Sequence, residues 1–345
     1  FKSFGEQLIA VLNAVIKKQI DPRLEEVRLK APAGMSEGIP ADGGFLVQPE
    51  YRQELLTRVY ETGILAPKCF NLPMSSNRVI IPGVDETSRA TGSRLGGVQV
   101  YWGDEATAPT AKKSKIREIE LTAKRMTALC YLTEELLEDA PAMEAWTMRA
   151  FGQEMGFEID DSIIRGDGAN KPHGVLNALA TVSVAKETNQ AASTIVAENV
   201  EKMYARMWAR SLPNAVWYIN QNCWPQIFQL HHAVGTGGVP MFIPAGGLIN
   251  SPFGTLLGRP IQPIEQCEGV GTVGDIIFAD LGEYILGRKG GLRGDSSIHV
   301  KFTTFERAFR FMMRLDGQSM WHDKLTPYKG TADTQSPFIT LATRA

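Results

Sequence analysis

The chain has 345 residues, of which 43% are hydrophobic and 21% are charged, and its formal net charge at pH 7 is -2. This composition supplies enough apolar side chains for a buried core and is typical of a globular protein. The near-neutral charge excludes a strongly basic nucleic-acid binder and a cationic membrane binder. No apolar run approaches the ~20 residues that span a bilayer, so we expect no membrane partner.

The four cysteines are far apart in the sequence and form no CxxC pair: Cys69, Cys130, Cys223 and Cys267. This spacing argues against a zinc site and against a disulfide framework. We therefore expect scattered core thiols that stay reduced in the cytoplasm of the cell where the protein folds.

Residues 4–18 (FGEQLIAVLNAVIKK) carry apolar side chains at helical spacing and predict a helix. Residues 19–44 are rich in proline and glycine and indicate an extended arm. A helix on such an arm cannot bury its apolar face alone, so it needs another surface, from its own body or from a neighbouring molecule. Residues 50–62 predict a further short helix.

Residues 78–82 (RVIIP) predict a strand, and the alternation in residues 115–133 predicts a second one. Between them, residues 83–115 are rich in small and charged side chains. A structureless insertion of this length is unusual inside a compact domain. We therefore expect a long two-stranded hairpin that projects from the body. Because an isolated hairpin is barely stable in water, it needs a partner surface.

The strongest helical pattern lies in residues 133–164, where Pro141 is expected to begin the longer of two helices. The glycine-rich turn RGDG follows, and Asp167 in it is expected to be a turn residue. The apolar face of the longer helix comprises Trp146, Met148, Phe151, Met155, Ile159, Ile163 and Ile164.

The second half of the chain mixes strands and helices without βαβ regularity, so the expected class is α+β. The patterns predict a helix over 197–211, a buried strand in AVWYIN, a helix over 224–231 and a long exposed loop over 233–255. Successive strands are expected in LGRPIQPIE, DIIFADLGEYILGRKGG and IHVKFTTFERAFRFMMRLDGQSM.

The sequence offers little chemistry. Residues 269–274 match GxGxxG, but a strand pattern follows them where a dinucleotide site needs a helix, so we expect a flexible strand connection. His231 and His232 are expected on different faces of a helix and unable to share a metal. We expect no catalytic residue, no cofactor site and no metal site.

Two charged clusters have ordinary explanations. Glu154, Glu158, Asp160 and Asp161 are expected to form a solvated helix face instead of a general acid/base pair. The basic tract at 288–293 is expected to be a hairpin turn with charged flanks, with contact to phosphate as the alternative.

The order of several segments resembles the major capsid proteins of tailed bacteriophages with the HK97-type fold. The segments that carry this resemblance span nearly the whole chain: DGGFLVQPEY (42–51), NLPMSSNRVIIP (71–82), YWGDEATAPTAKKSKIREIELTAKRMTALCYLTEELLEDA (101–140), FEIDDSIIRGDGANKPHGVLN (157–177), LLGRPIQPIE (256–265), DIIFADLGEYILGRKGG (275–291) and FERAFRFMMRLDGQSM (305–320).

The resemblance implies an HK97-like organisation with a long spine helix in the peripheral domain. The implied parts are an N-terminal arm (1–44), a peripheral domain with an inserted extension-loop hairpin (45–77, loop 78–115, and 116–194 with the spine helix), an axial domain (195–294), and the peripheral return strands and C-terminus (295–345).

The resemblance also implies a structural function. Subunits would form pentamers and hexamers of an icosahedral shell around packaged double-stranded phage DNA, with no sequence-specific DNA contact. Further partners would be portal, scaffolding or decoration proteins. The protein would assemble in the bacterial cytoplasm and reside in the virion. The expected inter-subunit contacts are the loop residues Arg89, Arg94, Trp102, Asp104, Glu105, Lys112 and Lys113.

Some relatives link their subunits through a lysine–asparagine isopeptide bond, with the loop lysine directly before a proline. Here Ala108 precedes Pro109, and residues 300–315 contain no asparagine, so we expect a shell held by non-covalent contacts. The alternatives are an encapsulin-like nanocompartment shell around a cargo enzyme, and a hydrolase or oxidoreductase whose site carries no recognisable motif.

Overall fold

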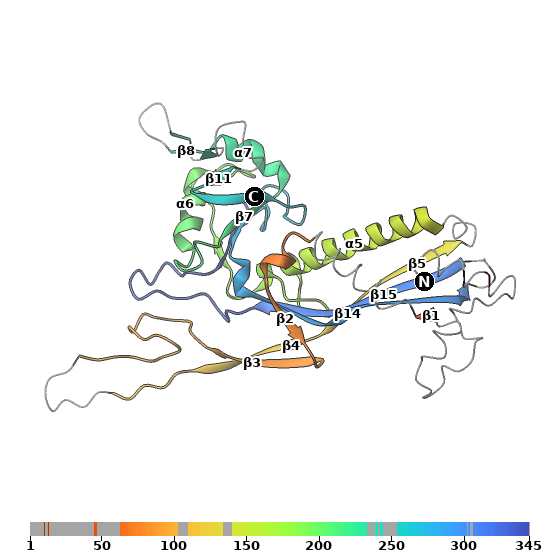
Figure 1. Cartoon of the computed structure of the whole chain (residues 1–345). Helices are drawn as coiled ribbons and strands as arrows, with labels where there is room; N and C mark the ends of the chain where they lie inside the picture. Colours follow the sequence, from red (N-terminus) through yellow and green to blue (C-terminus); the bar gives the residue numbers. More distant parts are fainter. Residues whose placement is uncertain are drawn as a thin grey trace. The chain divides into compact units, whose positions relative to one another are not determined.

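The computed structural model (Figure 1) describes most of the chain from Gly63 onward. The described residues are 63–102, 110–133, 140–232, 239–240, 242–243, 254–301, 303 and 306–344, together with 10, 13, 45 and 46. The predicted helices at 4–18 and 50–62 and the arm at 19–44 lie outside these ranges, apart from those isolated positions.

The chain divides into two compact units. The first comprises Phe1–Ile64, Lys124–Ile159 and Lys289–Leu315, and the second comprises Leu65–Ala123, Asp160–Arg288 and Asp316–Ala345. No described helix is long and apolar enough to cross a membrane.

The first unit is built on strand β5 (Lys124–Thr133), which pairs antiparallel with β15 (Glu306–Ser319). Strand β1 (Phe45–Leu46) pairs antiparallel with β14 (Tyr284–Lys301). Figure 1 shows helix α5 (Ala140–Arg165) running along these strands. The rings of Phe151 and Phe311 join the helix to the sheet at 4.6 Å. The two layers thus bury one face of the sheet.

Helix α5 begins at Ala140, so the predicted helix start at Pro141 is confirmed. Met155, Ile159, Ile163 and Ile164 are buried, as their helical spacing predicts.

The prediction of a solvated carboxylate face is wrong for Asp160. Glu154 and Glu158 are exposed, but Asp160 is buried. Its carboxylate accepts hydrogen bonds from the backbone N–H groups of Leu65 at 3.2 Å and Ala66 at 3.1 Å. These groups begin the 3-10 helix η2 (Ala66–Lys68), where backbone donors have no partner in the helix itself. The buried carboxylate is therefore a cap for a distant segment.

The second unit contains a seven-stranded mixed sheet in the order β10-β11-β12-β7-β13-β16-β6. Its strands are β6 (Val182–Val184), β7 (Val216–Ile219), β10 (Phe242–Ile243), β11 (Thr255–Leu256), β12 (Arg259–Pro263), β13 (Ile276–Ala279) and β16 (Phe338–Leu341). At its centre Trp217 stacks on Phe278 at 3.9 Å, and the indole N–H of Trp217 donates to the Leu256 carbonyl. The predicted buried strand in AVWYIN is confirmed.

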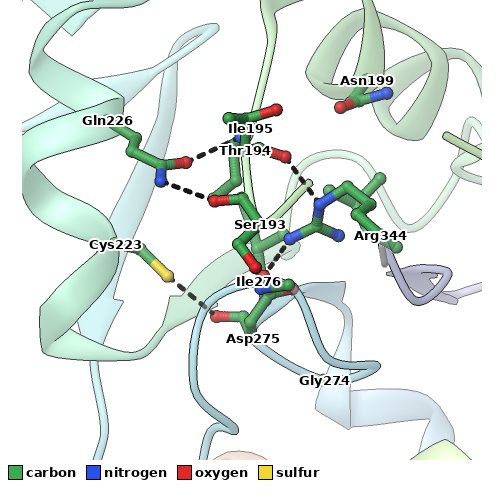
Figure 2. A network of polar contacts seen from close by, with 12 residues as sticks. Ser193, Thr194, Ile195, Asn199, Cys223, Gln226, Gly274, Asp275, Ile276 and Arg344 are labelled. Carbon is green, nitrogen blue, oxygen red and sulfur yellow. Dashed lines mark hydrogen bonds and ion pairs between the residues drawn. The ribbon is translucent and has the colours of Figure 1, made fainter. Parts of the chain in front are cut away.

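Helix α6 (Ala197–Arg206) is shorter than its predicted span. The chain becomes extended at Met207, which forms a parallel bridge to Ser336. Helix α7 (Trp224–Phe228) is tied to the segment before α6 through Gln226 (Figure 2). The Gln226 side chain accepts from the Ile195 N–H at 2.7 Å and donates to the Ser193 carbonyl at 2.9 Å.

Two further predictions, the helical His231–His232 and the hairpin turn at 288–293, are wrong. His231–His232 is not helical but forms strand β8, because these residues pair with β9 (Val239–Pro240). The tract at 288–293 is not a hairpin turn, because it lies inside the 18-residue strand β14. Gly290, at φ 66°, absorbs a local irregularity that a side chain would resist.

Two expected turns are confirmed. Asp167 accepts a hydrogen bond from the Ala169 N–H at 2.9 Å, beside Gly168 at φ 80°. Residues 269–274 connect β12 to β13, and a strand follows them as predicted. All four cysteines are free, with Cys130 half-buried and the other three buried in the core.

Candidate assembly surface

The predicted hairpin forms from strands β3 (Arg78–Val84) and β4 (Ile116–Thr122), which pair antiparallel along their whole length. Figure 1 shows them as a two-stranded ribbon within the second unit. One face of the ribbon packs on the body of that unit. There Ile119 and Leu121 are buried in a small cluster with Met74 of β2 (Phe70–Met74) and Ile285 of β14. This cluster supplies the support that an isolated hairpin lacks.

The opposite face of the ribbon is exposed, and on it apolar side chains lie beside the charged residues Arg78, Glu118 and Glu120. Ile80, Val84 and Ile116 leave 45%, 50% and 72% of their surface in contact with solvent. On the same face the guanidinium of Arg78 donates to the Glu120 carboxylate at 2.7 Å, and this bond lowers the pKa of Glu120. Neighbouring exposed apolar side chains of this kind mark interaction surfaces. These side chains were not predicted as contacts, although apolar residues at both odd and even positions of the strand RVIIP indicate two apolar faces.

Beyond the ribbon the two limbs of the loop stay hydrogen-bonded to each other. The Asp85 N–H donates to the Lys115 carbonyl at 2.9 Å, and the Lys115 N–H donates to the Gly96 carbonyl at 2.9 Å. Gly96 has φ 77°, and a Cβ there would lie 2.7 Å from the Lys115 carbonyl oxygen. The close approach of the two limbs therefore requires glycine at this position.

The first limb of the loop also contacts the segment between β15 and β16, called here the brace segment (residues 320–336). Ser88 and Thr326 form a parallel β-bridge. The Arg89 N–H donates to the Thr326 carbonyl at 2.8 Å, and the Thr326 N–H donates to the Thr87 carbonyl at 2.9 Å. The Arg94 guanidinium lies 5.7 Å from the centroid of the Tyr328 ring.

The seven predicted contact residues fall into three groups. Arg89 and Arg94 are engaged within the chain, Arg89 with Glu86 at 2.6 Å and Arg94 with Tyr328. Asp104 and Glu105 lie outside the described residues. The remaining three are exposed to solvent: Trp102, Lys112 and Lys113. Their contact with another subunit stays a prediction.

Little in this region resembles a catalytic or metal site. Within the described residues, no three His, Cys, Asp or Glu side chains gather closely enough to hold a metal ion. The loop offers instead a row of exposed side chains on a supported ribbon. Farther along the loop, Val100, Tyr101 and the fully exposed Trp102 are further exposed apolar side chains. This arrangement suits contact with another macromolecule.

Comparison with known proteins agrees with this geometry. The model of the phage capsid family matches residues 43–329. Comparison with curated protein sequences gives no match. Among solved structures, a chain from the capsid of a native GTA particle is 18% identical, with a TM-score of 0.60, covering 91% of this chain and 96% of that one.

Two phage structures are similar at comparable coverage. A chain from Mycobacterium phage Adephagia is 13% identical, with a TM-score of 0.53, over 92% of this chain and 96% of that one. A chain from Microbacterium phage Oxtober96 is 14% identical, with a TM-score of 0.53, over 93% and 98%. At these identities the likeness establishes the fold, and the predicted α+β fold of HK97 type is confirmed. Because the family model covers most of the sequence, the chain is a structural capsid protein and belongs to the phage capsid family.

Proposed function

We propose that copies of this chain assemble into pentamers and hexamers of an icosahedral virion shell that encloses double-stranded phage DNA. The observation that carries the proposal is the group of exposed apolar side chains Ile80, Val84 and Ile116 on a ribbon whose other face is already buried. Membership of the phage capsid family supports it. The shell would assemble in the bacterial cytoplasm.

We assign the parts of the subunit as follows. Residues 78–115 are the extension loop that lies on the next subunit, and residues 1–44 are an arm that reaches across others. The peripheral domain comprises 45–77, 116–194 and 295–345, and the axial domain comprises 195–294. Portal, scaffolding or decoration proteins are further partners, and the packaged DNA is confined without sequence-specific contact.

The direct test is sedimentation velocity and electron microscopy of the purified protein over a range of concentrations. We expect closed particles in equilibrium with small oligomers. A protein that stays monomeric under all conditions would contradict the proposal. Particles isolated from the bacterial host should contain nuclease-resistant double-stranded DNA. Particles that contain a cargo enzyme instead would favour the nanocompartment alternative.

A triple variant tests the ribbon face itself. Ile80→Thr, Val84→Thr and Ile116→Thr keep β-branched side chains and strand propensity but remove much of the exposed apolar surface. We expect an unchanged circular dichroism spectrum and loss of particles. The control is Leu179→Thr, which changes another exposed apolar residue that lies outside the ribbon. Particle formation by the triple variant at the wild-type concentration would exclude this face from the interface.

The mode of linkage has its own readout. Ala108 stands where a cross-linking relative would need lysine before proline, so we expect non-covalent contacts. Particles dissolved in hot detergent should give a single monomer band on a denaturing gel. A ladder of covalent oligomers would refute this part of the proposal.

A further inference from the structure

The brace segment is fixed to the core of the second unit at its beginning. The Met320 N–H donates to the Glu283 carbonyl at 2.9 Å. The Trp321 indole N–H donates to the Glu283 carboxylate at 3.0 Å, and its ring packs edge-on against Trp208 at 4.9 Å. These contacts hold the segment against residues that immediately follow α6 and precede β14.

The end of the brace segment is fixed as well. Leu325 and Gln335 exchange two backbone hydrogen bonds of 2.8 Å, which close the segment into a loop. The Ser336 N–H donates to the Arg206 carbonyl at 3.1 Å, and the Arg206 guanidinium donates to the Thr334 carbonyl at 3.0 Å. Residues 325–328 therefore sit on a support that is tied down on both sides.

This supported stretch is the part that meets the extension loop. Besides the Ser88–Thr326 bridge, a Cβ added to Gly92 would lie 3.4 Å from the Tyr328 ring. At the root of the loop, His322 Nδ1 lies 3.6 Å from the Asp85 carboxylate. The Arg117 guanidinium donates to the Met320 carbonyl. The contacts with the brace segment thus extend along the proximal limb of the loop, from Asp85 to Arg94.

We infer that the brace segment sets the direction of the extension loop in the free subunit, and that this contact persists in the shell. The inference rests on the proposed function. A loop that is ordered before assembly does not have to be ordered during it, so less of the binding free energy is lost. The proximal limb (85–94) then stays with its own subunit. The exposed residues farther along, such as Trp102, Lys112 and Lys113, are left for the neighbouring copy.

A reversible covalent lock tests whether the contact persists. Bridged residues of neighbouring strands lie about 4.8 Å apart, within the range of about 4.4–6.8 Å that a disulfide spans. The double variant Ser88→Cys with Thr326→Cys should therefore form a disulfide, which peptide mass spectrometry verifies. We expect the oxidised subunit to assemble at the same concentration as its reduced form and as the two single variants.

The outcomes separate the inference from the proposed function. Oxidised subunits that fail to assemble, and regain assembly on reduction, would overturn the inference, because the loop would then have to leave the brace segment. Failure of the wild-type protein and every variant to assemble would contradict the proposed function instead. Failure of the disulfide to form in the folded subunit would also count against the inference.

A second pair of variants removes the positioning contact without a lock. Tyr328→Ala deletes the ring beside Gly92 and Arg94, whereas the control Tyr328→Phe keeps it. We expect Tyr328→Ala to speed hydrogen exchange of the Arg89 and Thr326 amides while the sheet core is unaffected. The concentration needed for assembly should rise about tenfold, the change that about 1.4 kcal/mol produces. Equal behaviour of the two variants would overturn the inference.

Discussion

The guanidinium of Arg344 and the carboxylate of Asp275 form an ion pair in the second unit, and neither side chain has any surface in contact with solvent. Arg344 also donates to the Thr194 carbonyl at 2.7 Å (Figure 2). It donates to the Ala342 carbonyl at 3.1 Å as well. The Asp275 carboxylate also accepts from the Gly271 N–H at 2.9 Å. Each buried charge thus has several hydrogen-bond partners, the condition under which a buried pair is tolerated.

Removal of one partner of this ion pair should lower the free energy of unfolding. Arg344→Met keeps most of the side-chain volume but leaves the Asp275 carboxylate buried without a counter-charge. We expect a loss of about 3–5 kcal/mol in the free energy of unfolding, measured by urea denaturation. The double variant with Asp275→Asn should recover a large part of this loss. A loss below about 1 kcal/mol for Arg344→Met would show that the pair does not stabilise the fold.

The tight packing at Gly317 provides a second prediction. A Cβ at this position would lie 2.7 Å from the hydroxyl oxygen of Tyr284, whose ring is buried and whose hydroxyl donates to the His173 carbonyl at 3.1 Å. Gly317→Ala should therefore lower the unfolding free energy by about 1–3 kcal/mol, as overpacking does. Gly269→Ala is the control, because no atom lies within 4 Å of the added carbon. Equal melting temperatures for the two variants would contradict the packing argument.

The four thiols should differ in reactivity. Burial raises the pKa of Cys223 to about 12, with the Asp275 charge as a further cause, and burial also raises the pKa of Cys69 and Cys267. Since the thiolate is the reactive form, these three thiols should resist iodoacetamide at pH 8 in the folded, unassembled subunit. Cys130 is only partly buried, so it should react first. Mass spectrometry should count one label before denaturation and four in urea; early labelling of a second site would contradict this.

The sequence pattern predicted an element correctly where contacts between residues close in the sequence determine its structure. The alternation around Ile119 and Leu121 predicted the hairpin, because successive strand residues face opposite sides of the ribbon. The start of α5 followed from Pro141, which suits the first helical turn. The turn at Asp167 followed from glycines that reach positive φ, as Gly168 does.

Long-range contacts left no such signal. Nothing near Asp160 in the sequence reveals that the backbone N–H groups of residues 65 and 66 donate to its carboxylate. The pairing of Ser88 with Thr326 joins residues more than two hundred positions apart, so the brace segment was not predicted. Glycines at 290 and 291 indicated a turn, but this tract lies inside β14, which pairs with β1, β2 and β15.

Glu283 provides a prediction with a defined dependence on pH. Burial raises the pKa of its carboxyl group above the ordinary value of 4.5, and the hydrogen bond from Trp321 opposes this rise only partly. A carboxyl group with a raised pKa in the folded state favours folding below its unfolded pKa, and this contribution is lost as the pH rises through the folded pKa. Glu283→Gln keeps an oxygen acceptor for Trp321 and removes the charge. It should raise the melting temperature at pH 7.

The gain should be small, within about 1 kcal/mol, because the carboxylate remains partly solvated. It should disappear below pH 4, where the wild-type group is protonated in both the folded and unfolded states. Glu198→Gln is the matched control in the same unit: this carboxylate lies in the first turn of α6, where a negative charge favours the helix. Its replacement should leave the melting temperature at pH 7 equal or lower. A melting temperature for Glu283→Gln that is lowered at pH 7, or raised equally at pH 7 and pH 3.5, would contradict the assignment of a destabilising buried charge at Glu283.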